Sequence, residues 1–436
     1  MSPESGAAAQ RPAGPLLPPL PDPVDLDDLL EPFSRRGVDL GLDRLQAALA
    51  EGGTPQERFA AVQVAGTNGK GSICTLLHSI LRSAGLRVGT YRSPHLVSWC
   101  ERIQLDEAWI TPAQLRDDLS RWQAIGRRHA LTPFELLTAA AFDRFARSDL
   151  DLVILEVGLG GRLDATTAHP CRSVIGLASI GLDHREHLGD TLAAIAAEKA
   201  GVMMAAADVF SAPQEPEVAA VLEAEARRCG SRLHWLEPLP DVTAGGPILG
   251  LSGGWQRRNA AVAVAMARAL AQRGWAIPES AIRDGLAAAR WPGRLEPRRW
   301  RGRPLLLDGA HNPPAAEALA RELQALAHSS GAPGGGRRWL LGIQRHKQAP
   351  EMLQALLRPG DRARIVPIPD HHCWDVAALA AALPELAACL EPGSGGEGGF
   401  ARDLDWLVQE ADSAVPVVAG SLHLLGEVMP LLDPVA

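Results

Sequence analysis

Up to residue 290, short apolar runs alternate with longer segments in which apolar residues recur at helical spacing. The short runs predict strands at Ala60–Val64, Arg87–Tyr91, Asp151–Val157, Ser173–Ser179 and Asp208–Ala212. The longer segments predict helices at about residues 72–84, 112–127, 135–147, 189–200, 215–229, 257–272 and 278–290. Short buried strands separated by helices are typical of a parallel sheet that is covered on both faces.

The same alternation restarts after Trp291-Pro292-Gly293-Arg294, a sequence that stops a helix and is typical of a hinge. Beyond it we predict strands at Pro304–Leu307, Arg338–Gly342, Ala363–Pro367 and Val415–Ala419. Predicted helices cover residues 313–326, 349–357, 375–390 and 421–431. We therefore expect a proline-rich flexible tail over residues 1–25, an α/β domain over 26–294 and a smaller α/β domain over 295–436.

Composition narrows the class of protein. A length of 436 residues fits two or three domains, and a net charge of −8 argues against nucleic acid as the main partner. No apolar run reaches the roughly 18 residues of a membrane helix, and the N-terminus lacks the pattern of a signal peptide. The six cysteines form no C-x-x-C pair, so we expect reduced thiols in the cytoplasm, without zinc knuckles or disulfides.

A glycine-rich loop lies between the first predicted strand and the first predicted helix. Backbone N–H groups of such a loop, a helix N-terminus and a lysine together suit phosphate oxygens. The loop departs from a strict Walker A motif, because Val64 replaces the first glycine and Gly71 separates the lysine from the hydroxyl residue. The alternative is a glycine turn before an exposed helix. The nucleotide interpretation assigns phosphate binding to Gly66, Thr67, Asn68, Gly69, Lys70, Gly71 and Ser72.

Polar side chains follow two further strands of the predicted sheet. Glu156 ends one buried strand, and Asp183 and His184 follow the next one. Ligands of open α/β sheets bind beyond the carboxyl ends of the strands, where Glu156 would reach a phosphate-bound Mg²⁺. His184 is a candidate metal ligand oriented by Asp183. The alternatives are a glutamate held by backbone amides and a histidine with a local hydrogen bond.

Lys199 lies on the apolar face of a predicted helix, together with Leu192, Ile195 and Val202. A lysine in this position is costly unless it forms a pair or loses its charge. A lysine with a lowered pKa can capture CO₂ and become a carbamate, an anion suited to Mg²⁺. The alternatives are a snorkelling lysine and an ion pair with Glu156 or Asp183.

A second strand–polar–helix junction opens the smaller predicted domain. The strand that ends at Leu307 is followed by Asp308, and Pro313 is suited to the first position of the next helix. Asp308 would hold a ribose hydroxyl or orient a nucleotide across the cleft, or would only cap its own turn. Arg294 on the hinge would reach phosphate or adenine.

In this order and spacing, the motifs resemble the dihydrofolate synthase/folylpolyglutamate synthase family, which belongs to the Mur ligase type. The resemblance runs from about Val38 to Leu431. It is carried by the strings Asp39-Leu40-Gly41-Leu42, AGTNGKGS, Ser93-Pro94-His95-Leu96, Glu101-Arg102-Ile103, EVGLGGRLDAT, LDH, Glu198-Lys199-Ala200-Gly201, PGR and DGAHNP. It implies an N-terminal P-loop ATPase domain with a parallel sheet, a smaller C-terminal Rossmann-like domain, and a cytoplasmic monomer without nucleic-acid or membrane partners.

The resemblance also implies roles for the matching positions. Catalysis would involve Lys70, Glu156, His184 and Lys199. ATP would contact the glycine loop together with Asn259, Arg294 and Asp308. Two Mg²⁺ sites would draw on Ser72, Ser93, Glu156, His184 and a carbamylated Lys199. The folate pocket would contain Asp39, Leu40, Thr132, Phe134, Glu135, Leu163, Asp164 and Ala165, and glutamate would meet His311 and Ser421.

The implied reaction joins L-glutamate to dihydropteroate, and to the glutamate tail of tetrahydrofolate, through an acyl phosphate made from ATP. The sequence leaves open whether both steps are catalysed. The alternatives are a non-catalytic nucleotide switch and a Mur-type cell-wall ligase. For the ligase, the roughly 55 residues before the first strand are too few to form an extra domain.

Two departures from the family pattern concern the substrate side: Pro133 stands where an aromatic residue is common, and Gly342–Gln348 lacks acidic residues.

Overall fold

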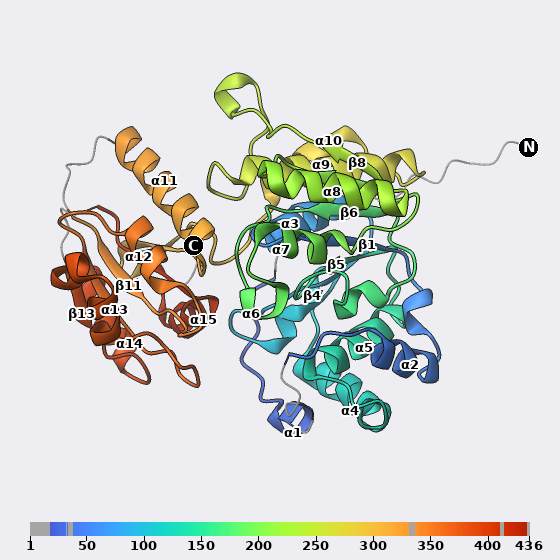
Figure 1. Cartoon of the computed structure of the whole chain (residues 1–436), viewed down its shortest axis with the longest axis horizontal. Coiled ribbons are helices and arrows are strands. Elements are labelled where there is room, and N and C mark those ends of the chain that lie inside the picture. Colours follow the sequence, from blue (N-terminus) through green and yellow to red (C-terminus); the bar gives the residue numbers. More distant parts are fainter. Residues whose placement is uncertain (1–17, 32, 34–37, 331–335, 410–413, 434–436) are drawn as a thin grey trace, which may run out of the picture.

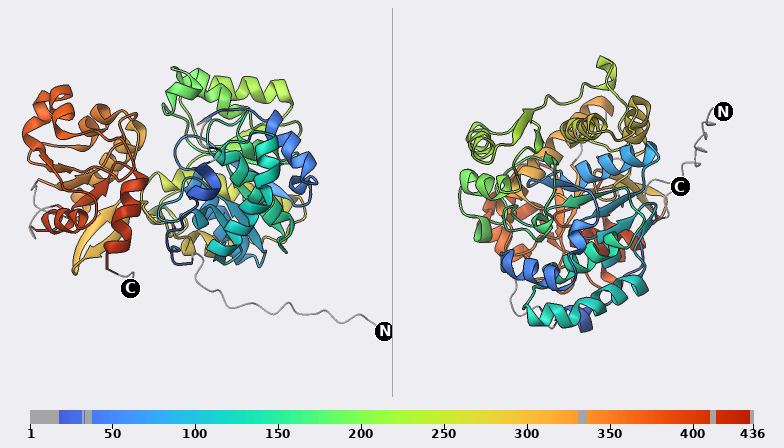
Figure 2. Two further views of the ribbon diagram at one scale, coloured as in Figure 1. Left: turned by 90° about the horizontal axis from the view of Figure 1, so that it is seen from below. Right: turned by 90° about the vertical axis from the view of Figure 1, so that its right-hand side faces the viewer.

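A computed structural model of the chain describes residues 18–31, 33, 38–330, 336–409 and 414–433. They form a larger and a smaller α/β part that lie side by side (Figures 1 and 2). Residues 1–17, most of the predicted tail, lie outside the described residues. Within the described ranges, we find no helix with the length and apolar character that crossing a membrane requires.

The larger part is built on an eight-stranded sheet in the order β4-β3-β2-β5-β1-β6-β7-β8. Six strands are mutually parallel: β1 (Ala61–Ala65), β2 (Val88–Tyr91), β5 (Leu152–Glu156), β6 (Val174–Leu177), β7 (Asp208–Ser211) and β8 (Arg232–Trp235). An antiparallel hairpin at the edge adds β3 (Ile103–Leu105) and β4 (Ala108–Trp109). All five predicted strands are present, whereas the very short β3 and β4 and the largely exposed β8 were not predicted.

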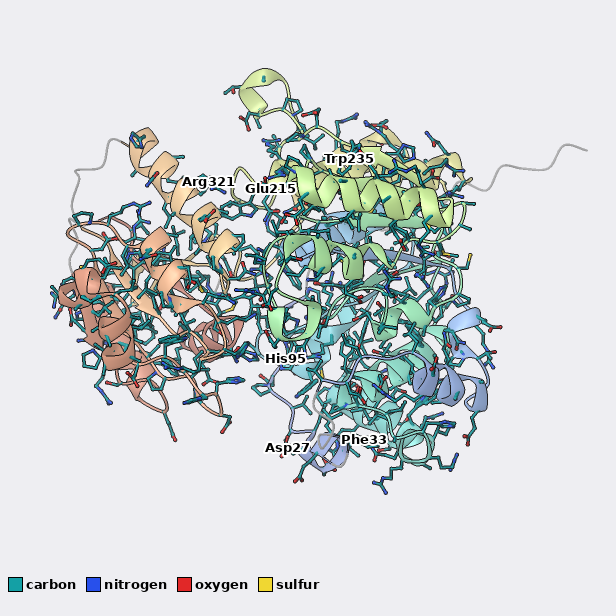
Figure 3. All side chains as sticks on the ribbon, viewed as in Figure 1. Asp27, Phe33, His95, Glu215, Trp235 and Arg321 are labelled. Atoms are coloured by element: carbon teal, nitrogen blue, oxygen red, sulfur yellow. The ribbon has the colours of Figure 1, made fainter. Side chains whose placement is uncertain are left out.

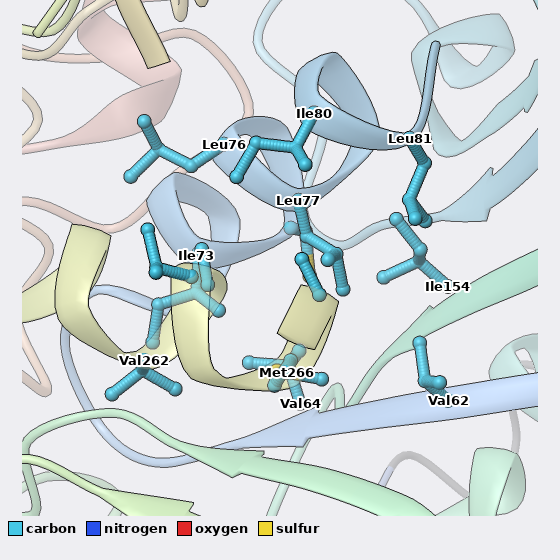
Figure 4. Close-up of a cluster of buried hydrophobic side chains, with 14 of the residues drawn as sticks. Val62, Val64, Ile73, Leu76, Leu77, Ile80, Leu81, Ile154, Val262 and Met266 are labelled. Carbon is cyan, nitrogen blue, oxygen red and sulfur yellow. The ribbon is translucent and has the colours of Figure 1, made fainter. Parts of the chain in front are cut away.

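Helices cover both faces of this sheet because successive side chains of a strand point to opposite faces. On one face, Val62 and Val64 pack against α3 (Lys70–Ser83), α9 (Gln256–Gln272) and α10 (Glu279–Ala288) (Figure 4). The opposite face meets α2 (Asp43–Glu51), α4 (Pro112–Arg128), α5 (Pro133–Ala146), α7 (Leu192–Ala200) and α8 (Pro216–Cys229). The covered sheet is the doubly wound arrangement that the apolar pattern predicts.

The smaller part has a six-stranded sheet in the order β13-β12-β11-β14-β10-β9. Its parallel strands are β10 (Arg303–Leu307), β11 (Arg338–Leu341), β12 (Arg362–Ile365), β13 (Leu390–Pro392) and β14 (Val417–Ala419). β9 (Glu296–Trp300) runs antiparallel at the edge. One face packs on α11 (Pro313–Ser330), α12 (Ala349–Leu356) and α13 (Val376–Ala382), and the other on α14 (Gly399–Leu407) and α15 (Leu422–Val428). The predicted fold class, a parallel-sheet P-loop domain followed by a smaller α/β domain, is confirmed.

The bounds of two predicted helices were wrong. The predicted helix over 375–390 ends at Ala382, because Pro384 disfavours helical backbone in the residue before it. The predicted helix over 189–200 is α7, which begins later, at Leu192, because the side chain of Thr191 caps it; α6 (Arg185–Leu188) is a separate short helix before the predicted range. α14 follows a glycine-rich stretch and was not predicted.

Strand register brings the predicted chemistry to one edge of the larger sheet. β1 is the strand between β5 and β6, and Val64 lies opposite Glu156 while Ala65 lies opposite Leu177. The glycine loop, the end of β5 and the segment after β6 therefore meet where parallel strands end, which is the edge where α/β sheets bind ligands.

Candidate active site

Two adjoining cavities lie at this edge, and residues from both parts of the protein line each of them. The first, which we call the loop cavity, has a volume of about 500 Å³ and includes the glycine loop. The second, the cleft cavity, has a volume of about 680 Å³. Ser93, His184 and His311 line both cavities, so a ligand in one can meet a ligand in the other. Glu215 and Arg321, labelled in Figure 3, approach the loop cavity from opposite parts.

The glycine loop has a backbone that only glycine permits at two positions. Gly66 and Gly69 have φ of 134° and 102°, where L side chains are strained. A Cβ on Gly66 would lie 2.7 Å from the Cβ of Ala178, and one on Gly69 would lie 2.5 Å from Asn259 Oδ1. The loop is also tied to the segment after β6, since the Thr67 N–H donates to the Ser179 carbonyl at 2.8 Å.

The nucleotide residues predicted from sequence gather at the loop cavity. Lys70 begins α3, and its Nζ donates to the carbonyls of Gly66 and Thr67, each at 3.1 Å. Gly66 itself does not line the cavity. Its carbonyl accepts hydrogen bonds from both Lys70 and Lys199. The cavity is lined by Thr67, Asn68, Gly69, Lys70, Gly71, Ser72, Asn259, Arg294 and Asp308. A helix N-terminus and a lysine converging on one cavity fit a phosphate chain.

Asp308 caps its own turn, which is one of the two interpretations of its sequence context, and it also lies at the wall of the loop cavity. Its carboxylate accepts hydrogen bonds from the Leu295 and Ala310 N–H groups, both at 2.9 Å, and so caps its own turn. It also lines the loop cavity, and burial raises its pKa. The side chain is therefore held in place by backbone N–H groups at the wall of the loop cavity.

Glu156 is the buried carboxylate of the loop cavity. Only 4% of the residue is exposed, and burial raises the pKa of its carboxyl to about 7, against the opposing effect of Lys70, Arg92 and Arg294. Ser93 and Ser72 line the same cavity. Within the described ranges, no three histidine, cysteine or acidic side chains lie close enough together to hold a metal ion by themselves. The carboxylate of Glu156 with the hydroxyls of Ser93 and Ser72 fits Mg²⁺, which takes one or two carboxylates and completes its coordination with phosphate oxygens and water.

His184 and Lys199 approach the loop cavity from the segment after β6 and from α7. Burial and neighbouring lysines lower the pKa of His184 to about 3, so the neutral ring has a lone pair available for a metal. Lys199 is 4% exposed, and its Nζ donates to the Gly66 carbonyl at 3.0 Å. Burial, and then Lys70, lower its pKa to about 7. The described residues contain no ion pair between Lys199 and a carboxylate, so the alternative pair with Glu156 or Asp183 is not observed.

A buried polar network joins the two parts and was not predicted. Asp183 accepts from Lys347 Nζ at 2.6 Å and from Asn312 Nδ2 at 2.9 Å. Asn312 also exchanges hydrogen bonds with Asn68 of the glycine loop, at 2.9 and 3.0 Å. Although burial opposes it, the adjacent His311 and Lys347 hold the pKa of Asp183 far below its usual value. The acidic partner of Lys347, missing from its own loop in the sequence, is therefore supplied by the other part.

The cleft cavity gathers every residue predicted on the substrate side. Its lining includes Asp39, Leu40, Thr132, Phe134, Glu135, Leu163, Asp164, Ala165, His311 and Ser421. Several of these also shape its wall: Asp164 accepts from the N–H groups of Gly158 and Leu159, at 3.0 and 2.9 Å. A Cβ on Gly158 would lie 2.5 Å from the Phe134 ring, so glycine allows this ring its position.

Local structure fixes the side chains at three places that the sequence analysis assigned to the substrate side of the cleft cavity. Pro133 occupies the first turn of α5, a position that suits proline, and the adjacent Phe134 supplies an aromatic ring. Thr132 and Glu135 form a capping box, and Arg44 Nε donates to Glu135 at 2.8 Å. Ser421 caps α15 by accepting from the His423 N–H at 3.1 Å. These side chains are fixed by local structure while lining the cavity.

Arg102 is a cation of the cleft cavity that sequence analysis missed. Its guanidinium carbon lies 4.2 Å from the Trp99 ring centroid, and its Nε donates to His95 Nδ1 at 2.9 Å. Figure 3 labels His95 on the larger part, on the side that faces the smaller part. The signal was available, since Arg102 belongs to a string that carries the family resemblance. Its charge suits a substrate carboxylate.

Comparison with known proteins gives consistent matches. A family model described as the C-terminal domain of dihydrofolate synthetase matches residues 294–431. The dihydrofolate synthase/folylpolyglutamate synthase of Escherichia coli K12 is 33% identical over 424 residues, covering 93% of this chain and 94% of that protein. The structure of E. coli FolC in complex with DHPP and ADP has a TM-score of 0.78 at 30% identity, covering 96% and 98% of the two chains.

A solved bifunctional folylpolyglutamate synthase/dihydrofolate synthase with Mn, AMPPNP and L-glutamate bound is also similar. Its TM-score is 0.74 at 29% identity, and the match covers 91% of this chain and 95% of that one. These similarities extend over nearly the whole length of both chains, so they concern both parts of the protein and the cleft between them.

Proposed function

Because the chain belongs to the dihydrofolate synthase/folylpolyglutamate synthase family, we propose that it joins L-glutamate to 7,8-dihydropteroate and also extends the glutamate tail of tetrahydrofolate. It is an ATP-dependent ligase that adds glutamate to folates. The observation that carries this function is the continuity of the two cavities through Ser93, His184 and His311. The cell-wall ligase and the nucleotide switch receive no support from the relatives named above.

The chemistry requires that a carboxylate oxygen become a leaving group. The folate carboxylate attacks the γ-phosphorus of ATP, which releases ADP and leaves an acyl phosphate. The glutamate amine then attacks the acyl carbon, loses a proton, and phosphate departs as the amide forms. Positioning and charge neutralisation are the tasks of the protein. Lys70 and the N–H groups of the glycine loop would hold the phosphates and offset their charge.

We assign the metal positions to residues of the loop cavity. Glu156, Ser93 and Ser72 would hold one Mg²⁺ at the nucleotide phosphates, and His184 with a carbamylated Lys199 would hold a second. When bound, Mg²⁺ offsets negative charge on the reacting phosphates. The carbamate forms when the neutral Lys199 amine adds to CO₂ and releases a proton. A pKa of about 7 supports this step, because much of the amine is then uncharged near neutral pH.

The cleft cavity would hold the folate and the incoming amino acid. Asp39, Leu40 and Phe134 would face the pterin with the other predicted lining residues: Thr132, Glu135, Leu163, Asp164 and Ala165. Arg102, His311 and Ser421 would meet glutamate, and Arg102 supplies the charge opposite its carboxylate. The Asp183–Lys347 pair would hold the cleft closed against water, which would otherwise hydrolyse the acyl phosphate.

The proposed domains follow from these roles. Residues 26–294 would form the ATP-binding domain, and residues 295–436 the domain that completes the glutamate site. We also infer that the chain acts in the cytoplasm as a monomer. All six cysteines are free, which agrees with a reducing compartment.

Phosphate release from ATP in the presence of glutamate tests the proposal, with dihydropteroate and tetrahydrofolate compared as acceptors. Amide formation is followed in parallel, so that phosphate release by simple hydrolysis is not counted as ligation. We expect turnover with both acceptors. Turnover with dihydropteroate alone would restrict the chain to the first step, and turnover with neither would overturn the proposed function.

A further inference from the structure

A third hollow lies next to the cleft cavity, in the smaller part, and the ligation chemistry above does not use it. It has a volume of about 400 Å³ and is lined by Gln344, Arg345, His346, His371 and His372. We call it the histidine pocket. Gln344 and His346 also line the cleft cavity, so the two hollows adjoin and an extended ligand can occupy both.

Two paired loops build the histidine pocket. One follows β11 and the other follows β12, at the carboxyl ends of parallel strands, where α/β sheets bind ligands. Gln344 and Cys373 form an antiparallel bridge, and the Arg345 N–H donates to the His372 carbonyl at 2.8 Å. The indole N–H of Trp374 donates to the Lys347 carbonyl at 3.1 Å. These bonds fix the pocket before a ligand arrives.

The lining of the histidine pocket suits an anion. The Arg345 guanidinium carbon lies 3.8 Å from the Trp374 ring centroid, which orients the side chain. Among the described residues, no carboxylate forms an ion pair with Arg345, and none lines the pocket. Each histidine ring keeps an N–H donor even when neutral. An oriented arginine without an acidic partner, surrounded by ring donors, fits a carboxylate group.

The pocket is also linked to the glutamate end of the cleft cavity. His371 Nδ1 lies 3.0 Å from Gln344 Nε2, and the rings of His371 and His423 have centroids 4.2 Å apart. His423 lines the cleft cavity beside Ser421, which the proposed function assigns to glutamate. The histidine pocket is therefore a continuation of the glutamate side of the cleft.

We propose that the histidine pocket binds an α-carboxylate of the γ-linked glutamate tail of a folate acceptor. This inference rests on the proposed function, and it assigns the tail to a place outside the pterin and nucleotide sites. A γ-linked tail presents one α-carboxylate for each glutamate, so it is a flexible polyanion that needs cationic donors along its path. Dihydropteroate has no tail and does not need the pocket, whereas an acceptor with several glutamates does.

The test compares acceptors with and without a tail in the wild type and in Arg345→Gln. We expect the KM for tetrahydropteroyl-triglutamate to rise about tenfold in this variant, since one charged hydrogen bond to a carboxylate is lost. The KM values for dihydropteroate, ATP and L-glutamate should not change. Arg301→Gln is the matched control, because Arg301 is also stacked on a tryptophan of the smaller part, with its guanidinium carbon 5.0 Å from the Trp300 ring, but lines none of the three cavities.

The outcomes separate this inference from the proposed function. An unchanged KM for the triglutamate in Arg345→Gln would overturn the inference, and so would an equal rise for L-glutamate, which would place the incoming amino acid in the pocket. A wild type that uses dihydropteroate but no tailed acceptor would also overturn it, while leaving the ligase function intact. If the wild type used neither acceptor, calorimetric binding of a free γ-linked triglutamate would decide: weaker binding to Arg345→Gln supports the pocket, and equal binding refutes it.

Discussion

Lysine is confined to the loop cavity and the cleft cavity in this protein. The chain has three lysines, Lys70, Lys199 and Lys347, and all three line the loop cavity or the cleft cavity, whereas every other residue among its 43 Lys and Arg is an arginine. Lysine combines a compact charge with a pKa that falls readily on burial, properties that arginine lacks. The three positions would use these properties differently: we propose a phosphate contact for Lys70 and a reactive amine for Lys199, whereas Lys347 forms a buried ion pair. Measurements specific for lysine side chains therefore report on the active site almost exclusively.

We expect Lys199 to be carbamylated in the active protein. Carbon-13 NMR in ¹³C-bicarbonate should show a carbamate resonance in the wild type that is absent from Lys199→Arg. Because burial lowers the pKa of this amine to about 7, the resonance and the ligation rate should decline together as pH falls below about 7. Active wild-type protein without the resonance would contradict the carbamate.

We expect Glu156→Gln to lose ligation by at least about a hundredfold while gaining stability. Burial raises the carboxyl pKa from 4.5 to about 7, so between these values the folded state binds the proton more tightly than the unfolded chain does. The wild-type free energy of unfolding therefore falls as pH rises through this window and stays reduced above it, whereas glutamine carries no charge. Urea unfolding without Mg²⁺ or nucleotide should show a gain of about 2 kcal/mol at pH 8 and little difference at pH 4.

Two other outcomes for Glu156→Gln would contradict these expectations. A Glu156→Gln variant that kept wild-type turnover at saturating Mg²⁺ would exclude this carboxylate from the metal site. A variant that was less stable than the wild type at pH 8 would show that the charged carboxylate is stabilised by Lys70, Arg92 and Arg294 more strongly than burial destabilises it.

At the scale of elements, the junction between β1 and α3 positions the glycine loop, where we propose that phosphate binds. The strand is buried along its whole length, the loop is fastened to the segment after β6, and the helix begins at Lys70. A helix that starts at this position directs its unpaired N–H groups into the loop cavity. The loop must turn sharply between the end of the strand and the start of the helix, and this turn requires the positive φ of Gly66 and Gly69.

We expect Gly69→Ala to weaken ATP binding at least about tenfold, because its Cβ would meet Asn259 Oδ1 and its backbone would be strained. Gly85→Ala is the matched control just beyond the other end of α3: its φ is also positive, at 85°, but no atom lies within 4 Å of the added Cβ. It should lose about 1 kcal/mol of stability and keep its ATP affinity. Calorimetric titration with a non-hydrolysable ATP analogue gives both affinities. Equal affinities in the two variants would show that the contact with Asn259 does not matter.

At the scale of the molecule, the cleft depends on a few buried bonds between the two parts. Asp183 and Asn68 belong to the larger part, and Lys347 and Asn312 to the smaller one. A buried charge whose partner is removed is costly, because its desolvation is no longer compensated. The network thus favours the closed arrangement, in which the loop cavity and the cleft cavity adjoin.

We expect Lys347→Met to uncouple ATP use from amide formation. Without the ammonium, Asp183 remains buried and unpaired, so the closed cleft becomes less favourable and water reaches the acyl phosphate. The ratio of phosphate released to amide formed should rise from near one to several, with a fall of at least about tenfold in the rate of ligation. A ratio that stayed at the wild-type value would show that the pair does not control closure.

The sequence by itself determined the local junctions: a buried apolar run, then a glycine loop or an acidic residue, then a helix. It was therefore sufficient for the positions of the main strands along the chain, the fold class and the glycine loop of the loop cavity, because each of these depends on neighbours in the chain; the substrate-side residues came from the family resemblance, and Arg102 was missed. Only the tertiary structure decided which distant groups meet. The partner of Lys347 lies 164 positions away in Asp183, and the contact between the tilted rings of His371 and His423 joins the loop after β12 to α15. Such pairs leave no periodicity in the sequence, since they arise when the packing of the two sheets brings together the loops at their carboxyl ends.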